Sequence, residues 1–146
     1  MVEIIKADLL DTTKGIICHQ VNSQGKMGAG IAKQIRIKYP QVYDDYMQVY
    51  QTSGLKLCSS IITQIDKELY VASLVGQKYF GRNKNYVYTN YDALKIALHK
   101  TSNYAKDLNL KLYIPFNMGC GLANGNWDKV FEIINNYAPN SIICRL

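Results

Sequence analysis

The chain has 146 residues, of which 48% are hydrophobic and 19% are charged, and this composition is typical of a single globular domain. The formal net charge of +6 favours anionic partners. No apolar run approaches the roughly 20 residues that span a bilayer, and the N-terminus lacks a signal-peptide pattern. We therefore expect a cytoplasmic protein with no membrane partner, and we expect it to be a monomer.

The four cysteines are scattered along the chain: Cys18, Cys58, Cys120 and Cys144. They form no C-x-x-C pair, and no histidine lies at metal-ligand spacing from them. This pattern predicts neither a metal site nor a disulfide framework, and no cofactor is predicted. Each cysteine is expected to act as a small core residue, with Cys120 a partial exception because it lies in a loop.

Apolar patterns along the chain predict alternating strands and helices. Six segments have strand patterns: residues 2–6, 15–22, 58–64, 69–75, 110–115 and 141–146. Four segments have helical spacing: residues 28–39, 42–51, 90–108 and 126–137. The first helix must end before Pro40, since the residue before a proline resists helical geometry. In the last helix, Asn126 fits the cap and Asp128 fits the first turn.

The element order ββααββαβαβ predicts an α/β fold, with a mixed, mostly parallel sheet that carries helices on both faces. On the helix at 42–51, a stripe of aromatic and apolar residues at helical spacing is typical of core packing: Tyr43, Tyr46, Met47 and Tyr50. In open sheets of this kind, ligands bind beyond the carboxyl ends of the strands.

Two glycine-rich segments occupy such positions, "NSQGKMGAG" at 22–30 and "NMGCGLANGN" at 117–126. Each follows a predicted strand and precedes a predicted helix, whose N-terminus offers unpaired amides and a partial positive charge to an anion. Glycine lets the main chain approach a phosphate closely and adopt a positive φ. A Rossmann motif fails because Lys33 occupies its third glycine position, and a P-loop lacks its G-K-[ST]. The pair of loops predicts a diphosphate held between them.

The basic residues form two local groups in the sequence. The first group contains Lys26, Lys33, Arg36 and Lys38, and the second contains Lys78, Arg82 and Lys84. Two interpretations stay open for them. They form either an ordinary solvated surface or an electropositive rim around an anion site.

The sequence also resembles a known family. The segments "KADLLDTT", "HQVNSQGKMGAGIAKQIRIKYP", "VASLVGQ" and "IPFNMGCGLANGNW" are similar, in order, to the signatures of the macro domain, an ADP-ribose-binding module. They cover nearly the whole chain. The resemblance implies a single macro domain over residues 1–146 and a three-layer α/β/α sandwich. Within the family, the chain looks closest to the branch of the terminal ADP-ribose protein glycohydrolase, the ADP-ribose-1''-phosphate phosphatase and phage or bacterial relatives.

The resemblance implies a role for each matching position. Asp8 and the Leu9 main chain would bind adenine, with Leu146 as a wall beside it, although Asp8 also fits a simple cap after the first strand. Asn22 would face the distal ribose. The first diphosphate loop would be formed by Gly28, Ala29, Gly30 and Ile31. The second would be formed by Asn117, Met118, Gly119, Cys120, Gly121, Leu122 and Ala123.

The catalytic residues of this branch do not all have counterparts here. In the glycohydrolase a lysine and an aspartate carry the chemistry, and the matching positions here are Gln77 and Ala123. The catalytic candidates are then His19, Asn22 and Lys78. His19 matches a histidine of the phosphatase, but it also fits a core histidine within an apolar strand. Lys78 follows Gln77 and faces the opposite way if the strand continues through it.

Three functions stay open at this point. The first is a hydrolase that acts on ADP-ribosylated protein or nucleic acid, on O-acyl-ADP-ribose or on ADP-ribose 1''-phosphate. The second is a reader that binds ADP-ribose without turning it over. The third is a nucleic-acid-binding domain, which the lack of a familiar aromatic and basic motif disfavours. The predicted partner is ADP-ribose or an ADP-ribosylated protein, DNA or RNA.

Overall fold

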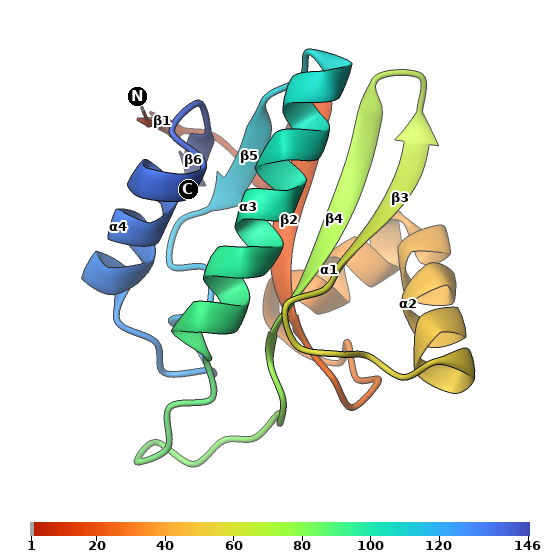
Figure 1. The fold of residues 1–146 in the computed structure, drawn as a ribbon, viewed down its shortest axis with the longest axis vertical. Helices are drawn as coiled ribbons and strands as arrows, with labels where there is room; N and C mark the ends of the chain where they lie inside the picture. Colours follow the sequence, from red (N-terminus) through yellow and green to blue (C-terminus); the bar gives the residue numbers. More distant parts are fainter. Residues whose placement is uncertain (1) are drawn as a thin grey trace.

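The computed structural model describes residues 2–146, and its strands form one sheet in the order β1-β6-β5-β2-β4-β3 (Figure 1). The strands are β1 (Glu3–Lys6), β2 (Gly15–Asn22), β3 (Ser60–Asp66), β4 (Leu69–Gln77), β5 (Leu112–Pro115) and β6 (Ile142–Arg145). Only β3 runs antiparallel to its neighbour, and the other pairings are parallel. The prediction of a mixed, mostly parallel sheet is confirmed.

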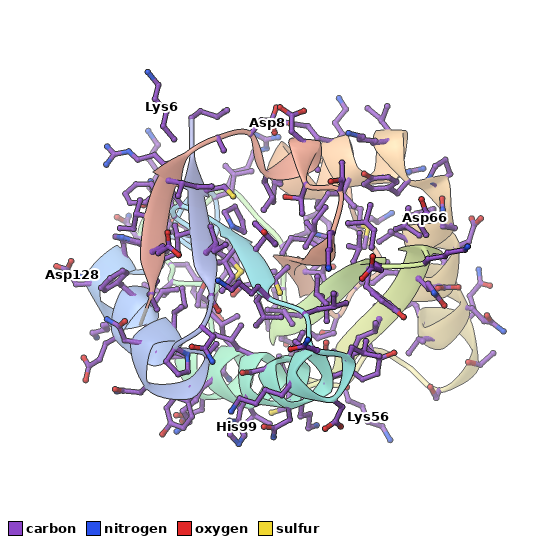
Figure 2. The ribbon with its side chains drawn as sticks, turned by 90° about the horizontal axis from the view of Figure 1, so that it is seen from above. Lys6, Asp8, Lys56, Asp66, His99 and Asp128 are labelled. Carbon is purple, nitrogen blue, oxygen red and sulfur yellow. The ribbon has the colours of Figure 1, made fainter. Side chains whose placement is uncertain are left out.

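Helices cover both faces of this sheet, so the chain forms the three-layer α/β/α sandwich that was expected (Figures 1 and 2). The helices are α1 (Gly30–Lys38), α2 (Pro40–Thr52), α3 (Tyr91–Leu108) and α4 (Trp127–Tyr137), together with the short 3-10 helix η1 (Leu9–Asp11). Helices α3 and α4 lie on one face, and α1 and α2 lie on the other. None of these helices in residues 2–146 combines the length and hydropathy needed to cross a bilayer.

The central strands β2 and β4 are buried almost throughout, as continuous apolar runs require of strands covered on both faces. Alternate residues divide between the two cores: Ile16 and Cys18 pack towards α3 and α4, whereas Ile17 and Val21 pack towards α1 and α2.

Some element boundaries differ from those predicted. Helix α2 begins at Pro40, because proline is well suited to the first helical position. Strand β3 begins and ends two residues later than expected, and η1 was not predicted. Asn126 caps α4 by accepting a hydrogen bond from the Lys129 amide at 3.2 Å, with Asp128 in the first turn, as predicted. Figure 2 shows Asp128 pointing outward from α4.

Three connections leave the carboxyl ends of parallel strands at the same edge of the sheet, which is the lower edge in Figure 1. They are residues 23–29 after β2, residues 78–90 after β4 and residues 116–126 after β5. Because the strands that precede them are hydrogen-bonded neighbours, these connections lie together in space. The candidate site is built from them.

Candidate functional site

A cavity of about 630 Å³ lies where β2 and β4 end. Its lining comes from β2, the first glycine loop, the start of α1, the segment after β4 and the second glycine loop. The lining residues are Gln20, Val21, Asn22, Lys26, Gly28, Ala29, Ala32, Gln77, Phe80, Gly81, Arg82, Leu122 and Ala123. The two glycine loops, which are far apart in the sequence, therefore face one space.

The first glycine loop is held in shape by Asn22 and by Tyr46 of α2. The Asn22 Oδ1 accepts hydrogen bonds from the amides of Gln24 and Lys26 at 3.0 and 3.3 Å, and its Nδ2 donates to the Lys26 carbonyl at 2.8 Å. The buried Tyr46 hydroxyl donates to the Asn22 carbonyl at 2.6 Å and to its Oδ1 at 3.0 Å. Burial raises the pKa of Tyr46, which keeps this hydroxyl protonated and able to donate. Much of the hydrogen-bonding capacity of the Asn22 side chain is therefore used to shape the loop.

The aromatic stripe on α2 supports the same loop. Tyr46 is fully buried, which confirms the predicted core packing, but Tyr50 is 42% exposed. A Cβ on Gly25 would lie 2.9 Å from the Tyr50 ring, and Gly25 has a φ of +75°, so only glycine fits this turn without strain. The loop is thus built directly on the α2 side chains.

The N-terminus of α1 differs from those of α3 and α4. Asn90 and Asn126 cap α3 and α4, and each of these helices has an aspartate in its first turn. Helix α1 has Ala29 at its cap position, with no side-chain hydrogen bond and no acidic residue in its first turn. Its first amides have no intrahelical acceptor, and they lie beside the cavity. The helix therefore offers its partial positive charge to whatever fills the cavity.

The second glycine loop is folded tightly onto its own main chain. The Gly119 carbonyl accepts hydrogen bonds from the Gly125 amide at 2.9 Å and from the Thr89 hydroxyl at 2.6 Å. A Cβ on Gly125 would lie 2.4 Å from that carbonyl, so glycine is required there. The Ala123 carbonyl accepts from the Tyr88 amide at 2.8 Å, which ties this loop to the segment after β4.

The charges that face the cavity are positive. Lys26 and Arg82 line it, and the lining includes no carboxylate and no histidine. Lys26 belongs to the first basic group of the sequence and Arg82 to the second. For these two residues, the structure favours an electropositive rim over an ordinary solvated surface. Among residues 2–146, no cluster of three histidine, cysteine or acidic side chains is arranged to hold a metal ion.

A chain of side-chain hydrogen bonds lies beneath the cavity. The Gln20 Nε2 donates to the Gln77 Oε1 at 2.8 Å and to the Thr89 hydroxyl at 2.9 Å. Thr89 donates in turn to Gly119, so the network joins β2, β4 and the second glycine loop. The Gln77 Nε2 donates to the Tyr79 carbonyl at 2.8 Å, which fixes the orientation of this carboxamide at the cavity wall.

A family model for the macro domain matches residues 18–134. The chain belongs to the macro domain family. The resemblance noted in the sequence is thereby confirmed.

Solved structures share this fold across almost the whole chain. A Bacteroides thetaiotaomicron protein of unknown function has a TM-score of 0.89 at 23% identity, covering 99% of this macro domain and 96% of that chain. The macrodomain of Thermus aquaticus DarG has a TM-score of 0.81 at 16% identity, and the match covers 99% of this chain and 96% of that chain. Thermosipho africanus DarTG, solved in complex with ADP-ribose, has a TM-score of 0.80 at 16% identity, and the match covers 99% of this chain and 42% of that chain. At these identities the likeness shows the fold alone.

Curated relatives share more sequence over a shorter stretch. The ADP-ribose 1''-phosphate phosphatase of Saccharomyces cerevisiae (strain YJM789) is 29% identical over 97 residues, which is 63% of this chain and 55% of the relative. The phosphatase of the same name from Candida glabrata is 32% identical over 78 residues, which is 50% of this chain and 44% of the relative. These alignments span about half the length of the curated relatives.

The predicted loop residues are not equally close to the cavity of this macro domain. Asn22, Gly28, Ala29, Leu122 and Ala123 line it. The remaining loop residues do not: Gly30, Ile31, Asn117, Met118, Gly119, Cys120 and Gly121. The Met118 side chain is buried in the core, and burial raises the pKa of Cys120 to about 11, which keeps its thiol neutral. Gln77 and Ala123, where the glycohydrolase has its lysine and aspartate, both face the cavity.

The structure places His19 outside the cavity lining, and a catalytic role for it stays a prediction. His19 has no exposed surface and does not line the cavity; its Nε2 lies 2.8 Å from the Ser73 hydroxyl, within the core. Burial lowers the pKa of His19 to about 3, so the ring is neutral at physiological pH. The alternative that the sequence left open, a core histidine, describes it. Val21, two residues further along the same face of β2, does line the cavity, so His19 is separated from it by its depth in the core.

The structure places Lys78 outside the lining of this cavity. Gln77 lines the 630 Å³ cavity, whereas Lys78 lines a different cavity of about 590 Å³. Strand β4 ends at Gln77 and the chain bends at Lys78, so strand alternation does not set the direction of the Lys78 side chain, and its catalytic role stays a prediction. Lys78 Nζ instead lies 5.4 Å from the Tyr79 ring centroid.

The predicted adenine residues lie outside the cavity lining. Asp8 caps η1, where its side chain accepts a hydrogen bond from the Leu10 amide at 2.9 Å, so the cap that the sequence allowed is present (Figure 2). Leu9 is buried, whereas Leu146 is 89% exposed. Asp8 and Leu146 follow the carboxyl ends of the neighbouring strands β1 and β6. A role for them in adenine binding stays a prediction.

The sequence analysis missed several residues that build the site. Gln20, Phe80 and Gly81 line the cavity, and Thr89 accepts a hydrogen bond from Gln20 at the cavity wall. Thr89 lies in none of the quoted signature segments, and Gln20 lies in one without a role of its own, because the importance of both comes from pairings between distant segments. Arg82 was noted only as a member of a basic group.

Proposed function

We propose that this protein is a single-domain ADP-ribose-binding macro domain that hydrolyses a bond at the distal ribose. The bond is either an ADP-ribosyl linkage to a protein or nucleic acid, or the phosphoester of ADP-ribose 1''-phosphate. The observation that carries the proposal is the cavity itself, where two glycine loops and two cations, with no carboxylate, face one space. The names of the solved DarTG complex and of the curated relatives point to the same ligand class.

The binding part of the proposal follows from the electrostatics of the cavity. A diphosphate placed between the loops would accept hydrogen bonds from main-chain amides at the uncapped start of α1. Hydrogen bonds to a charged group contribute about 1.5–3 kcal/mol each, and an anion at a helix N-terminus adds about 0.3–1 kcal/mol. Lys26 and Arg82 add long-range attraction. Together these contributions are large enough for micromolar affinity.

The catalytic part relies on positioning, because no lining residue is an evident nucleophile or general base. For ADP-ribose 1''-phosphate, a water molecule attacks phosphorus and the bond between phosphorus and the C1'' oxygen breaks, giving ADP-ribose and inorganic phosphate. The fixed carboxamide of Gln77 and the side chain of Asn22 are the candidates to orient that water. Lys26 and Arg82 would stabilise the developing negative charge. Orientation alone contributes up to about 7–11 kcal/mol in favourable cases.

A reader function is the second candidate, and the same lining supports it. A cavity without a carboxylate or a histidine binds an anion well but supplies no group for proton transfer near neutral pH. In that case the protein would bind ADP-ribosylated partners without cleaving the ADP-ribose from them.

One set of measurements separates these functions. Calorimetry with ADP-ribose tests binding, and three substrates tested in parallel assess turnover: glutamate-linked ADP-ribosyl protein, ADP-ribosylated DNA and ADP-ribose 1''-phosphate. Binding with turnover of at least one substrate supports the hydrolase. Binding with no turnover of any substrate supports the reader. An absence of ADP-ribose binding at millimolar concentration overturns both.

A further inference from the structure

The three arginines of the chain have different surroundings. The Arg36 guanidinium stacks 3.8 Å from the centroid of the Tyr43 ring, and that of Arg145 lies 4.4 Å from the centroid of the Phe116 ring. Within residues 2–146, the Arg82 side chain makes no ion pair, hydrogen bond or aromatic stack. Arg82 is also the arginine that lines the cavity. An unpaired guanidinium at the wall of an anion site is available for a ligand.

Arg82 lies on residues 78–88, which we call the strap. The strap has no helix or strand of its own, yet it contributes Phe80, Gly81 and Arg82 to the cavity wall. Its sequence, "KYFGRNKNYVY", carries cations and no carboxylate. A segment of this kind needs hydrogen bonds to other parts of the chain if it is to hold one conformation.

Those hydrogen bonds come from the two glycine loops. On one side, the Gln24 Oε1 of the first loop accepts a hydrogen bond from the Phe80 amide at 2.9 Å. On the other side, the Asn124 Nδ2 of the second loop donates to the Asn83 carbonyl at 2.9 Å and to the Tyr86 carbonyl at 2.8 Å. Both contacts of Asn124 fall just beyond Arg82 along the strap. Hydrogen bonds therefore hold the main chain of the strap on both sides of Arg82.

Asn124 suits this role for a conformational reason. Its φ is +60°, in the left-handed region, where asparagine and glycine are the residues best tolerated. Asn124 does not line the cavity. Its side chain therefore acts on the strap rather than on a ligand.

We propose that Arg82 binds a phosphate of the ligand and that Asn124 is the positioning residue that holds Arg82 at the cavity wall. This inference rests on the proposed ADP-ribose function and names two residues for it. An arginine held in place before binding loses less conformational freedom when the complex forms. Its planar fork can donate two parallel hydrogen bonds to a phosphate, which a lysine cannot do.

The test is calorimetry of ADP-ribose with the wild type, Asn124→Gly, Arg82→Ala and the double variant. Glycine tolerates the φ of Asn124 and removes both strap contacts. The matched control is Asn109→Gly at the C-terminal cap of α3, where asparagine has a φ of 55° and is remote from the cavity. We expect Arg82→Ala to weaken binding about tenfold, Asn124→Gly about fivefold and Asn109→Gly not at all. Arg82→Lys should recover only part of the loss.

The double variant tests whether Asn124 acts through Arg82. If it does, the double variant binds about tenfold more weakly than the wild type, as Arg82→Ala does alone. A loss near fiftyfold, the product of the single losses, would mean independent roles and would overturn the positioning claim. Wild-type affinity in Arg82→Ala would overturn the phosphate contact.

Amide hydrogen exchange separates failure of this inference from failure of the proposed function. In ligand-free protein, Asn124→Gly should speed exchange at the strap amides of Asn83 and Tyr86, whereas Asn109→Gly should not. Unchanged strap exchange in Asn124→Gly overturns the positioning role even if ADP-ribose binds. If the wild type does not bind ADP-ribose, both the proposed function and the phosphate contact of Arg82 are overturned. The exchange result still decides whether Asn124 holds the strap.

Discussion

Replacement of Gly28 by glutamate is the most direct perturbation of the anion site. Gly28 lines the cavity, has an ordinary φ, and a Cβ built on it meets no atom within 4 Å. The new side chain therefore fits without strain, unlike one at Gly30, where φ is +58°. The substitution places a carboxylate next to the uncapped start of α1, where the diphosphate is expected. We predict that folding is preserved and that ADP-ribose binding is weakened.

The size of the effect follows from Coulomb's law. A carboxylate about 5 Å from one phosphate charge costs about 3 kcal/mol at an effective dielectric constant of about 20, and about 0.8 kcal/mol in bulk water. Binding should then weaken by between about fourfold and about two-hundredfold, and we expect at least tenfold. The same carboxylate can interact with the free amides of α1 in the absence of ligand, so the free energy of unfolding should stay constant or rise by about 0.3–1 kcal/mol.

The matched control is Gly28→Gln, which has nearly the same volume and no charge. Calorimetry with ADP-ribose at low and high salt should show a large difference between the two variants at low salt and a smaller one at high salt, because added ions screen the repulsion. Urea denaturation should show that neither variant is less stable than the wild type. If the glutamate and glutamine variants bind ADP-ribose equally, charge repulsion at this position is not the cause. If both bind as the wild type does, Gly28 does not face the ligand.

Three further predictions concern residues whose surroundings the structure describes. Asp8→Asn keeps the cap on η1 and should weaken ADP-ribose more than ribose 5-phosphate in calorimetry, whereas an equal loss for both ligands would contradict adenine binding by Asp8. Tyr46→Phe removes the donor to Asn22, so it should lower the free energy of unfolding by about 1–3 kcal/mol in urea denaturation and weaken ADP-ribose; unchanged affinity would show that the first loop keeps its shape without that hydroxyl. The pKa of His19 is lowered from 6.5 to about 3 in the folded protein, so protonation favours unfolding, and stability should fall by up to about 1.4 kcal/mol per pH unit as the pH drops below 6.5. His19→Gln should remove this slope, and parallel pH profiles for the two proteins would contradict it.

Much of the fold was predictable because its signals are local. The apolar run at 15–22, the asparagine caps before α3 and α4, and the order of strands and helices all depend on residues close in sequence. The two glycine loops were predictable for the same reason, since each is a strand end followed by a helix start. Their convergence on one cavity follows from the rule that parallel strands end at one edge of the sheet.

Two of the catalytic candidates could not be placed from the sequence. His19 has no exposed surface, and Lys78 lines the 590 Å³ cavity, whereas Gln77 lines the 630 Å³ cavity. A local pattern does not say how deep a strand residue lies or where the chain bends after the strand, because both depend on the packing of distant segments.

The sequence by itself determined the element order, the positions of the two glycine loops and the surplus of positive charge, since periodicity, capping and composition act over short stretches of chain. Tertiary structure alone decided that Gln20 meets Gln77 and Thr89, partners 57 and 69 residues away, and that Asn124 holds the strap of Arg82. A hydrogen bond between distant segments depends on the final packing of the sheet and its helices, and no local pattern encodes it.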